Sequence, residues 1–282
     1  MISAPEVPRT AAHGLRLTVG GREADPGPLR WVRAVFDAFA PAFLHITEGA
    51  LRIAEGITGA AEGPPARIGD TVVLSLTGEE RFRGRIDRIS FAAGGSTTIA
   101  AREAWAGRAL RLPRDEEYRE STDAEVAARI ADALGLAARI DSTEEVHRAL
   151  VRRGDPIEFL GQRARASGRR FGLAEGTLHF ARALPVDRPV RELEPGARVF
   201  AFESIEWRGG SGGSIAVDGF PEIFPLDFLK LFPRLHGRAA EDSVARRISR
   251  VDWTWDGRRM ATRLSWIREE SWAAREEGRV TE

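Results

Sequence analysis

The chain has 282 residues, which is long enough to bury a sizeable core and predicts two or three modules. Its 42 acidic and 42 basic residues cancel, so the composition provides no electrostatic attraction to nucleic acid or to an anionic membrane. The absence of cysteine excludes disulfide bonds and thiolate metal sites. No apolar run approaches the roughly 20 residues of a membrane span, and the first residues lack the features of a secretory signal. We therefore expect assembly in the cytoplasm, no membrane span and no nucleic-acid partner.

The first third of the chain alternates apolar and polar residues, a pattern typical of half-buried strands. Gly20-Gly21 is a turn signal after the first of these strands. Residues 48–67 show neither a helical nor a strand period and are interpreted as a loop with one short strand at 51–57. The other strands are predicted at 15–19, 29–35, 43–47, 71–76, 81–91 and 97–102.

The predicted strand at 81–91 contains an irregularity. Phe82 and Ile86 share one face, but Ile89 lies out of phase with them. A one-residue slip would move apolar side chains to the solvent face of a half-buried sheet. We therefore predict a β-bulge near Asp87–Arg88, which bends the strand and favours a small closed barrel.

The stretch with the clearest start and stop signals follows a polar connection. Residues 104–120 are interpreted as this connection, anchored by Trp105, Leu110 and Leu112. Residues 121–180 then predict a helix, an extended run, a second helix and a β-hairpin. This order of signals is more specific than any one of them.

The first of these helices begins with a capping box. Glu125 follows Thr122 by three residues, so that the hydroxyl accepts from a free backbone N–H and the carboxylate bonds back. Gly135 ends the helix, because glycine adopts the left-handed conformation at little cost. The buried stripe is predicted to consist of Val126, Ile130, Ala133 and Leu134.

The second helix repeats this arrangement. Asp155 is its predicted N-cap, Pro156 occupies the first helical position, where no N–H is needed, and Glu158 lies at the third position. Downstream, Glu175-Gly176 is a favourable two-residue turn between two apolar strands.

The order "STDAEVAARIADALGL", "VHRALVRR" and "GDPIEFLGQRARASGRRFGLAEGTLHF" resembles the central α/β module of phage tail hub proteins. These form the late control gene D family, which includes the hub part of the secretion protein VgrG. A looser resemblance extends back through "GDTVVLSL" and "RFRGRIDRISF". The sequence departs from the family at Arg152 and Arg153, where many relatives carry glutamine. A contact that the glutamine amide makes in those relatives is therefore not expected in this chain.

The resemblance implies an α+β, mainly β fold: two small β-barrels with an inserted α/β module of two helices and a hairpin. It also implies a structural protein without cofactors, assembled as a homotrimeric ring that joins the spike to the tail tube. The implied partners are further copies of the chain, the spike, the tail tube and other baseplate proteins of a phage tail or injection particle. The expected domains are 14–113 (first barrel), 114–195 (α/β module) and 196–275 (second barrel elements).

The C-terminal part predicts a strand at 198–207, a flexible Gly/Ser linker at 209–213 and a closing hairpin that turns at Asp256-Gly257. The segment 219–237 combines phenylalanines with prolines that preclude one long helix. It either packs aromatic side chains over a barrel end or docks a partner. In the second case the docking residues are Phe220, Ile223, Phe224, Phe228, Leu231 and Phe232.

No motif in the sequence predicts catalysis or a metal site. The histidines at positions 13, 45, 147, 179 and 236 do not pair at metal-ligand spacing, and no nucleophile elbow or phosphate loop is present. Arginine pairs such as Arg152-Arg153 are interpreted as solvated edges. Two alternatives stay open: a tail-associated cell-wall hydrolase, which needs paired carboxylates or a metal in a cleft, and a carbohydrate-binding module, which seven tryptophans favour.

Overall fold

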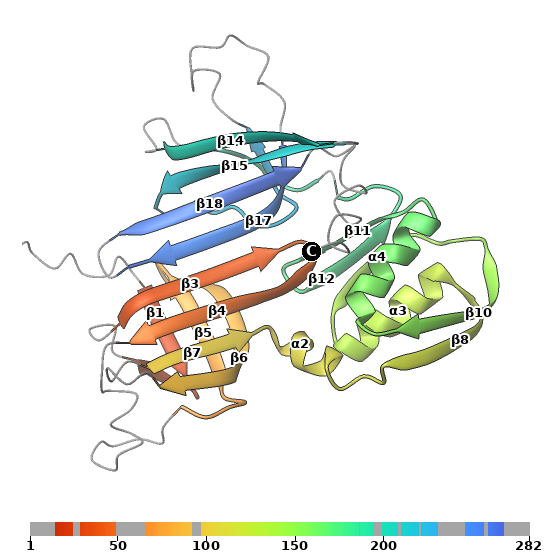
Figure 1. Ribbon diagram of the computed structural model, residues 1–282, viewed down its shortest axis with the longest axis horizontal. Coiled ribbons are helices and arrows are strands. Elements are labelled where there is room, and N and C mark those ends of the chain that lie inside the picture. Colours follow the sequence, from red (N-terminus) through yellow and green to blue (C-terminus); the bar gives the residue numbers. More distant parts are fainter. Residues whose placement is uncertain are drawn as a thin grey trace, which may run out of the picture. The chain divides into compact units, whose positions relative to one another are not determined.

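The computed structural model describes a mainly β protein that has three helices among the described residues, which confirms the predicted α+β, mainly β class (Figure 1). The chain divides into two compact units, the first built mainly from residues before Ala104 and the second mainly from Trp105 onwards. The three-domain division expected from the sequence stays a prediction. The described residues are 15–24, 29–48, 66–91, 97–185, 187–193, 199–207, 210–219, 221–230, 246–256 and 259–267.

The first unit is a curled antiparallel sheet. Its strands follow the order β3-β4-β7-β6-β5-β1-β2, and Figure 1 shows the sheet curling into a half-barrel. Leu17, Leu74 and Ile86 point inward and are buried, because each strand turns one face to the core. The predicted strands are present, except that 51–57 lies outside the described residues. The strands are β1 (Leu15–Val19), β2 (Arg22–Ala24), β3 (Leu29–Asp37), β4 (Ala40–Glu48), β5 (Thr71–Leu76), β6 (Glu79–Phe91) and β7 (Thr97–Arg102).

The bulge predicted in β6 is confirmed. Ile86 and Arg88 lie opposite consecutive residues of β7, so one extra residue, Asp87, is inserted between them. Ile86 stays in the core, while Arg85 and Arg88 both stay exposed on the outward face. The bulge therefore determines which side chains β6 presents to solvent.

The second unit contains the predicted α/β module. Its two main helices pack with the hairpin around an apolar core that includes Val126, Leu160 and Phe180. β10 pairs antiparallel with β8, and β9 runs parallel to β12 beside the β11–β12 hairpin. The elements are α2 (Ala104–Ala109), β8 (Asp115–Thr122), α3 (Asp123–Leu134), β9 (Ala137–Ile140), β10 (Val146–Arg153), α4 (Pro156–Ala166), β11 (Arg170–Ala174) and β12 (Thr177–Ala181).

Both helices have side-chain N-caps. Thr122 Oγ1 accepts from the N–H of Glu125 at 3.2 Å, and the Glu125 carboxylate accepts from the N–H of Thr122 at 2.7 Å, which completes the capping box. Asp155 Oδ1 accepts from the N–H groups of Ile157 and Glu158 at 2.7 and 3.1 Å. These bonds satisfy backbone donors that the first turn of a helix leaves unpaired.

The interpretation of 104–120 as a polar connection is wrong. It contains the helix α2 and the strand β8, and Leu110 is 81% exposed and anchors nothing. Trp105 is buried as expected. The strand was missed because its only large apolar side chain is Tyr118, and because its partner β10 lies far along the chain.

The Gly/Ser stretch is also not a flexible linker. It forms β15 (Gly210–Asp218), which pairs with β14 (Val199–Trp207) and with β18 (Met260–Ile267). A Cβ atom on Gly213 would lie 2.2 Å from the carbonyl oxygen of Glu203 and 2.5 Å from the ring of Trp266. Glycine is needed there because a neighbouring backbone and an indole ring occupy the space of a side chain.

The closing hairpin is present, and Gly257 of its predicted turn lies outside the described residues. β17 (Arg246–Trp255) lies next to β18, and Val251 and Trp253 alternate inward as predicted. The N–H of Asp256 donates to the carbonyl of Arg259 at 3.2 Å, a bond between the described residues on either side of the turn.

Arg152 is a buried structural residue and not part of a solvated edge. Only 1% of it is exposed, and it donates to the carboxylate of Glu116 at 2.9 Å and to the carbonyls of Pro113 and Gly154. The hydroxyl of Tyr118 donates to the same carboxylate at 2.8 Å. Burial would raise the pKa of Glu116, but the hydrogen bonds from Arg152 and Tyr118 outweigh it and lower that pKa.

We expect Gly213→Ala to lower the free energy of unfolding by about 1–3 kcal/mol, the usual range for overpacking. The added methyl group meets Trp266 and the backbone of β14. Gly107→Ala in α2 is the control, because a Cβ there meets nothing within 4 Å. Denaturant unfolding should show a loss for the first variant only; equal stability of both would contradict the packing role.

We expect Arg152→Met to lower the free energy of unfolding by about 3 kcal/mol, because Glu116 and two carbonyl groups lose their donor. Arg153→Met is a matched control, since the neighbouring side chain is exposed and should change stability by less than about 0.5 kcal/mol. Similar decreases in the free energy of unfolding of the two variants would show that the loss of a positive charge, and not the loss of the buried hydrogen bonds of Arg152, causes the effect.

Candidate functional site

In the part of the chain that the structure describes, titratable side chains do not gather into a metal centre. Among the described residues, no three His, Asp or Glu side chains are placed to hold a metal ion. His45, His147 and His179 lie on different strands, and the histidines at 13 and 236 fall outside the described ranges. None of the described helices is long and apolar enough to span a bilayer.

The described part of the predicted docking segment packs against the core. Ile223 is 3% exposed, and Phe224 makes an edge-to-face contact with Phe36 at 6.2 Å. Phe228, in the short strand β16 (Phe228–Lys230), lies under the guanidinium of Arg247 at 4.3 Å. These positions favour the packing alternative, and the docking role stays a prediction. Three residues of the set lie outside the described part: Phe220, Leu231 and Phe232.

A buried carboxylate fixes this segment. Asp227 is fully buried, and it accepts from Arg188 at 2.7 Å and from the N–H of Phe224 at 3.0 Å. Burial raises the pKa of Asp227, and these donors oppose the shift only in part. Because its oxygens are used by contacts within the fold, Asp227 is a structural residue.

His179 is a second buried titratable group. It lies in β12, between β11 and β9, and is 5% exposed. Burial, and then the positive charges of Arg139 and Arg188, lower its pKa to about 4. The imidazole is therefore neutral in the folded protein at neutral pH.

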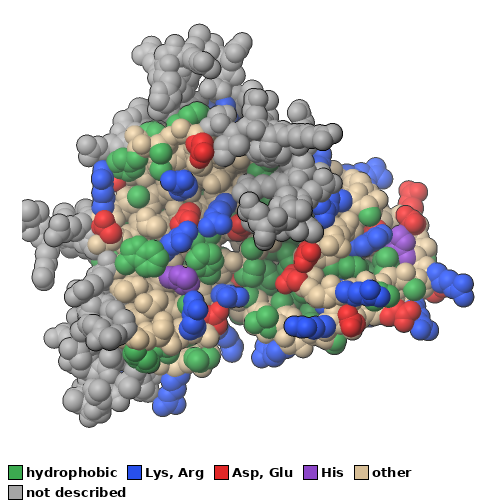
Figure 2. Space-filling view, viewed as in Figure 1, with side chains coloured by type: hydrophobic (Ala, Val, Ile, Leu, Met, Phe, Trp, Pro, Cys, Tyr) green, Lys and Arg blue, Asp and Glu red, His purple; other side chains and the backbone are tan. Residues whose placement is uncertain are grey.

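The outward face of the first unit gathers arginines beside two ring side chains. On β4, the rings of Phe43 and His45 lie 5.1 Å apart. Arg102 of β7 lies opposite Phe43, Arg85 of β6 lies opposite Arg102, and Arg88 follows one row along. Figure 2 shows basic side chains gathered beside hydrophobic ones on the described part of this face. We call this surface the basic face and define it by Phe43, His45, Arg85, Arg88 and Arg102.

Two of the three arginines of the basic face have no ion pair with any described residue. Arg102 is paired with Asp87 at 2.8 Å, whereas no ion pair joins Arg85 or Arg88 to a carboxylate in the described part of the chain. Burial, and then the charges of Arg88 and Arg33, lower the pKa of His45. The face therefore carries excess positive charge, although the whole chain is neutral.

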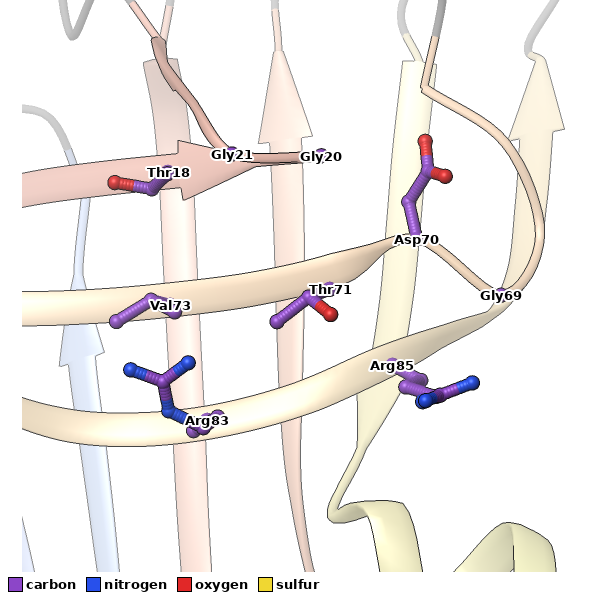
Figure 3. A pocket seen from close by; sticks show the side chains of 9 residues that line it. All are labelled: Thr18, Gly20, Gly21, Gly69, Asp70, Thr71, Val73, Arg83 and Arg85. Carbon is purple, nitrogen blue, oxygen red and sulfur yellow. The ribbon is translucent and has the colours of Figure 1, made fainter.

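A shallow depression continues the basic face across β5 and β1 (Figure 3). Arg83 and Arg85 of β6 lie opposite Val73 and Thr71 of β5, and all four line it. Arg83 is engaged by Glu80, so Arg85 is the unpaired cation shared by the depression and the basic face. Five residues complete the lining: Thr18, Gly20, Gly21, Gly69 and Asp70.

Sequence patterns alone give only a partial signal for this surface. Arg83 and Arg85 alternate with the buried residues Phe82 and Ile86, so their outward direction is readable once the strand is predicted. The pairing of β7 with β4, which sets Phe43 opposite Arg102, joins strands far apart in the sequence.

Comparison with known proteins gives matches by structure only. No family model matches this chain, and no curated protein matches it. The 43 kDa tail protein of prophage MuSo2 from Shewanella oneidensis matches with a TM-score of 0.66 at 13% identity, covering 93% of this chain and 98% of that chain. The chain has a tail-protein fold.

Two further structures share the tail-protein fold. The tail protein from Neisseria meningitidis MC58 has a TM-score of 0.65 at 12% identity, with 92% of this chain and 98% of that chain covered. The E. coli c3393 protein has a TM-score of 0.65 at 12% identity, with coverage of 89% and 76%. It is described as a component of the type VI secretion system with structural similarity to the T4 tail proteins gp27 and gp5.

We expect the free energy of unfolding to fall as the pH is lowered from 6.5 towards about 4, because the unfolded chain then binds a proton on His179 that the folded chain excludes. Each pH unit within this window removes about 1.4 kcal/mol. His179→Gln should lack this component. Its free energy of unfolding should therefore fall less than that of the unchanged protein as the pH is lowered. Parallel stability curves of the two proteins in urea across this window would contradict the buried neutral state.

Proposed function

We propose that this protein is a structural hub subunit of a phage tail or contractile injection machine, forming a homotrimeric ring that joins the spike to the tail tube. The observation that carries the proposal is the mutual coverage with two tail proteins, in which 98% of each of those chains is matched. Because a fold alone does not determine function, the proposal also uses the resemblance of residues 121–180 to the late control gene D module.

The partners of such a subunit are two further copies of itself, the spike, the tail tube and other baseplate proteins. Closed cyclic symmetry is the commonest arrangement of soluble homo-oligomers and suits a ring component. The similarity to the c3393 protein supports the same kind of machine. The segment 219–237, with Phe220, Ile223, Phe224, Phe228, Leu231 and Phe232 as the docking residues expected from the sequence, is the part that we propose for partner contact. The subunit would be assembled in the cytoplasm and then become part of the particle.

A structural role is better supported than either alternative. The buried carboxylates of Asp123 and Asp227 are each engaged by an arginine, which is unsuitable for a hydrolase acid or base. Stacking on sugars requires exposed aromatic faces. That requirement disfavours a carbohydrate-binding module, because four of the tryptophans are buried: Trp105, Trp253, Trp255 and Trp266.

Size-exclusion chromatography with light scattering should give a mass of three subunits, and the spike protein should co-purify with the ring. A monomer at micromolar concentration, both alone and mixed with the spike, would contradict the proposal. A peptidoglycan-release assay on the same sample should show no turnover. Measurable release, lost after removal of a cleft carboxylate, would favour the hydrolase.

A further inference from the structure

The arginines of the basic face are held outward by the core of the first unit. Phe82 and Ile86 alternate with them on β6 and are buried, so the strand cannot turn its arginines inward without exposing both apolar side chains. The paired strand fixes the backbone positions from which the two side chains project, and the planar guanidinium loses less entropy per hydrogen bond to a carboxylate than an ammonium group does. Arg85 and Arg88 are therefore outward-facing cations that make no ion pair with a described residue.

The shape next to these cations suits an extended segment. The row that contains Arg88 continues through Ala100 of β7 to His45 of β4, with a small side chain between two longer ones. On the other side, the depression lined by Thr71 and Val73 begins at Arg85. An extended peptide that crosses β6 would contact Arg85 before the bulge and Arg88 after it.

The chemistry of the basic face favours an acidic protein over a nucleic acid. Binding of single strands relies on open aromatic faces for base stacking. Here the guanidinium of Arg33 lies over the ring of Phe43 at 5.9 Å, and His45 contacts the same ring. The neutral chain also lacks the overall positive charge that attracts polyanions from a distance.

We propose that the basic face docks an extended acidic segment of a partner protein, whose carboxylates bind Arg85 and Arg88. The occupant is an acidic segment of another protein, argued from its charge complementarity to Arg85 and Arg88, and a second copy of this chain is a separate outcome of the test. This inference specifies the chemistry of a partner, goes beyond the proposed hub function and does not require the trimer.

The test uses the full chain and a fluorescein-labelled oligoglutamate peptide, with binding measured by fluorescence anisotropy. The double variant Arg85→Glu, Arg88→Glu should bind about tenfold more weakly or worse, because two attractions become repulsions. The double variant Arg85→Gln, Arg88→Gln should show an intermediate loss of peptide affinity. It replaces the charge-reversal variant if that variant does not fold. The matched control is Arg111→Glu, Arg148→Glu, two exposed arginines of the second unit, which should retain the affinity of the unchanged protein.

A second measurement reports on the site itself. The pKa of His45, followed by NMR, should rise when the peptide binds, because nearby carboxylates stabilise the imidazolium. An equal loss of binding in the test and control variants, or an unchanged His45 titration, would overturn the inference.

Two outcomes would assign the face to another occupant. Tighter binding of an oligothymidylate, lost in the same variants, would assign it to nucleic acid. Loss of the trimer in the Arg85 and Arg88 variants would assign it to a second copy. A monomeric protein that still binds the peptide through these arginines would overturn the hub function and leave this inference standing.

Discussion

The burial of one face of each strand in the first unit is the constraint on which its outward surface depends. Because side chains alternate along a strand, the requirement that Leu74 and Ile86 enter the core also fixes which residues face solvent. The bulge at Asp87 corrects the phase once and thereby keeps both Arg85 and Arg88 outside. The basic face is thus fixed by the packing of the core. A slip of one residue along the strand would turn the arginines towards the core and the apolar side chains towards solvent.

In the second unit, a different requirement acts: every buried charge needs a partner. Arg163 of α4 donates to both carboxylate oxygens of Asp123, at 2.6 and 3.1 Å, and so connects α4 to the start of α3. Arg152 connects β10 to β8 through Glu116 in the same way. An unpaired buried charge costs several kcal/mol, so these pairs exclude alternative packings of the same apolar surfaces.

The similarity to tail proteins at only 12–13% identity shows which properties of the sequence the fold needs. Few residues are identical, so the shared fold does not depend on residue identity at most positions.

The sequence by itself determined the strand positions of the first unit, the bulge, the two capped helices and the α+β class, because these depend on local periodicity and on residues such as Thr122 and Asp155. It failed at β8 and β15, whose residues look like polar or flexible connections. Only the tertiary structure decided these, because β8 is stabilised by β10 and β15 is held between its neighbour β14 and β18, and both β10 and β18 lie far along the chain. The same holds for Arg152, which reads as a solvated arginine until the burial of its neighbours is known.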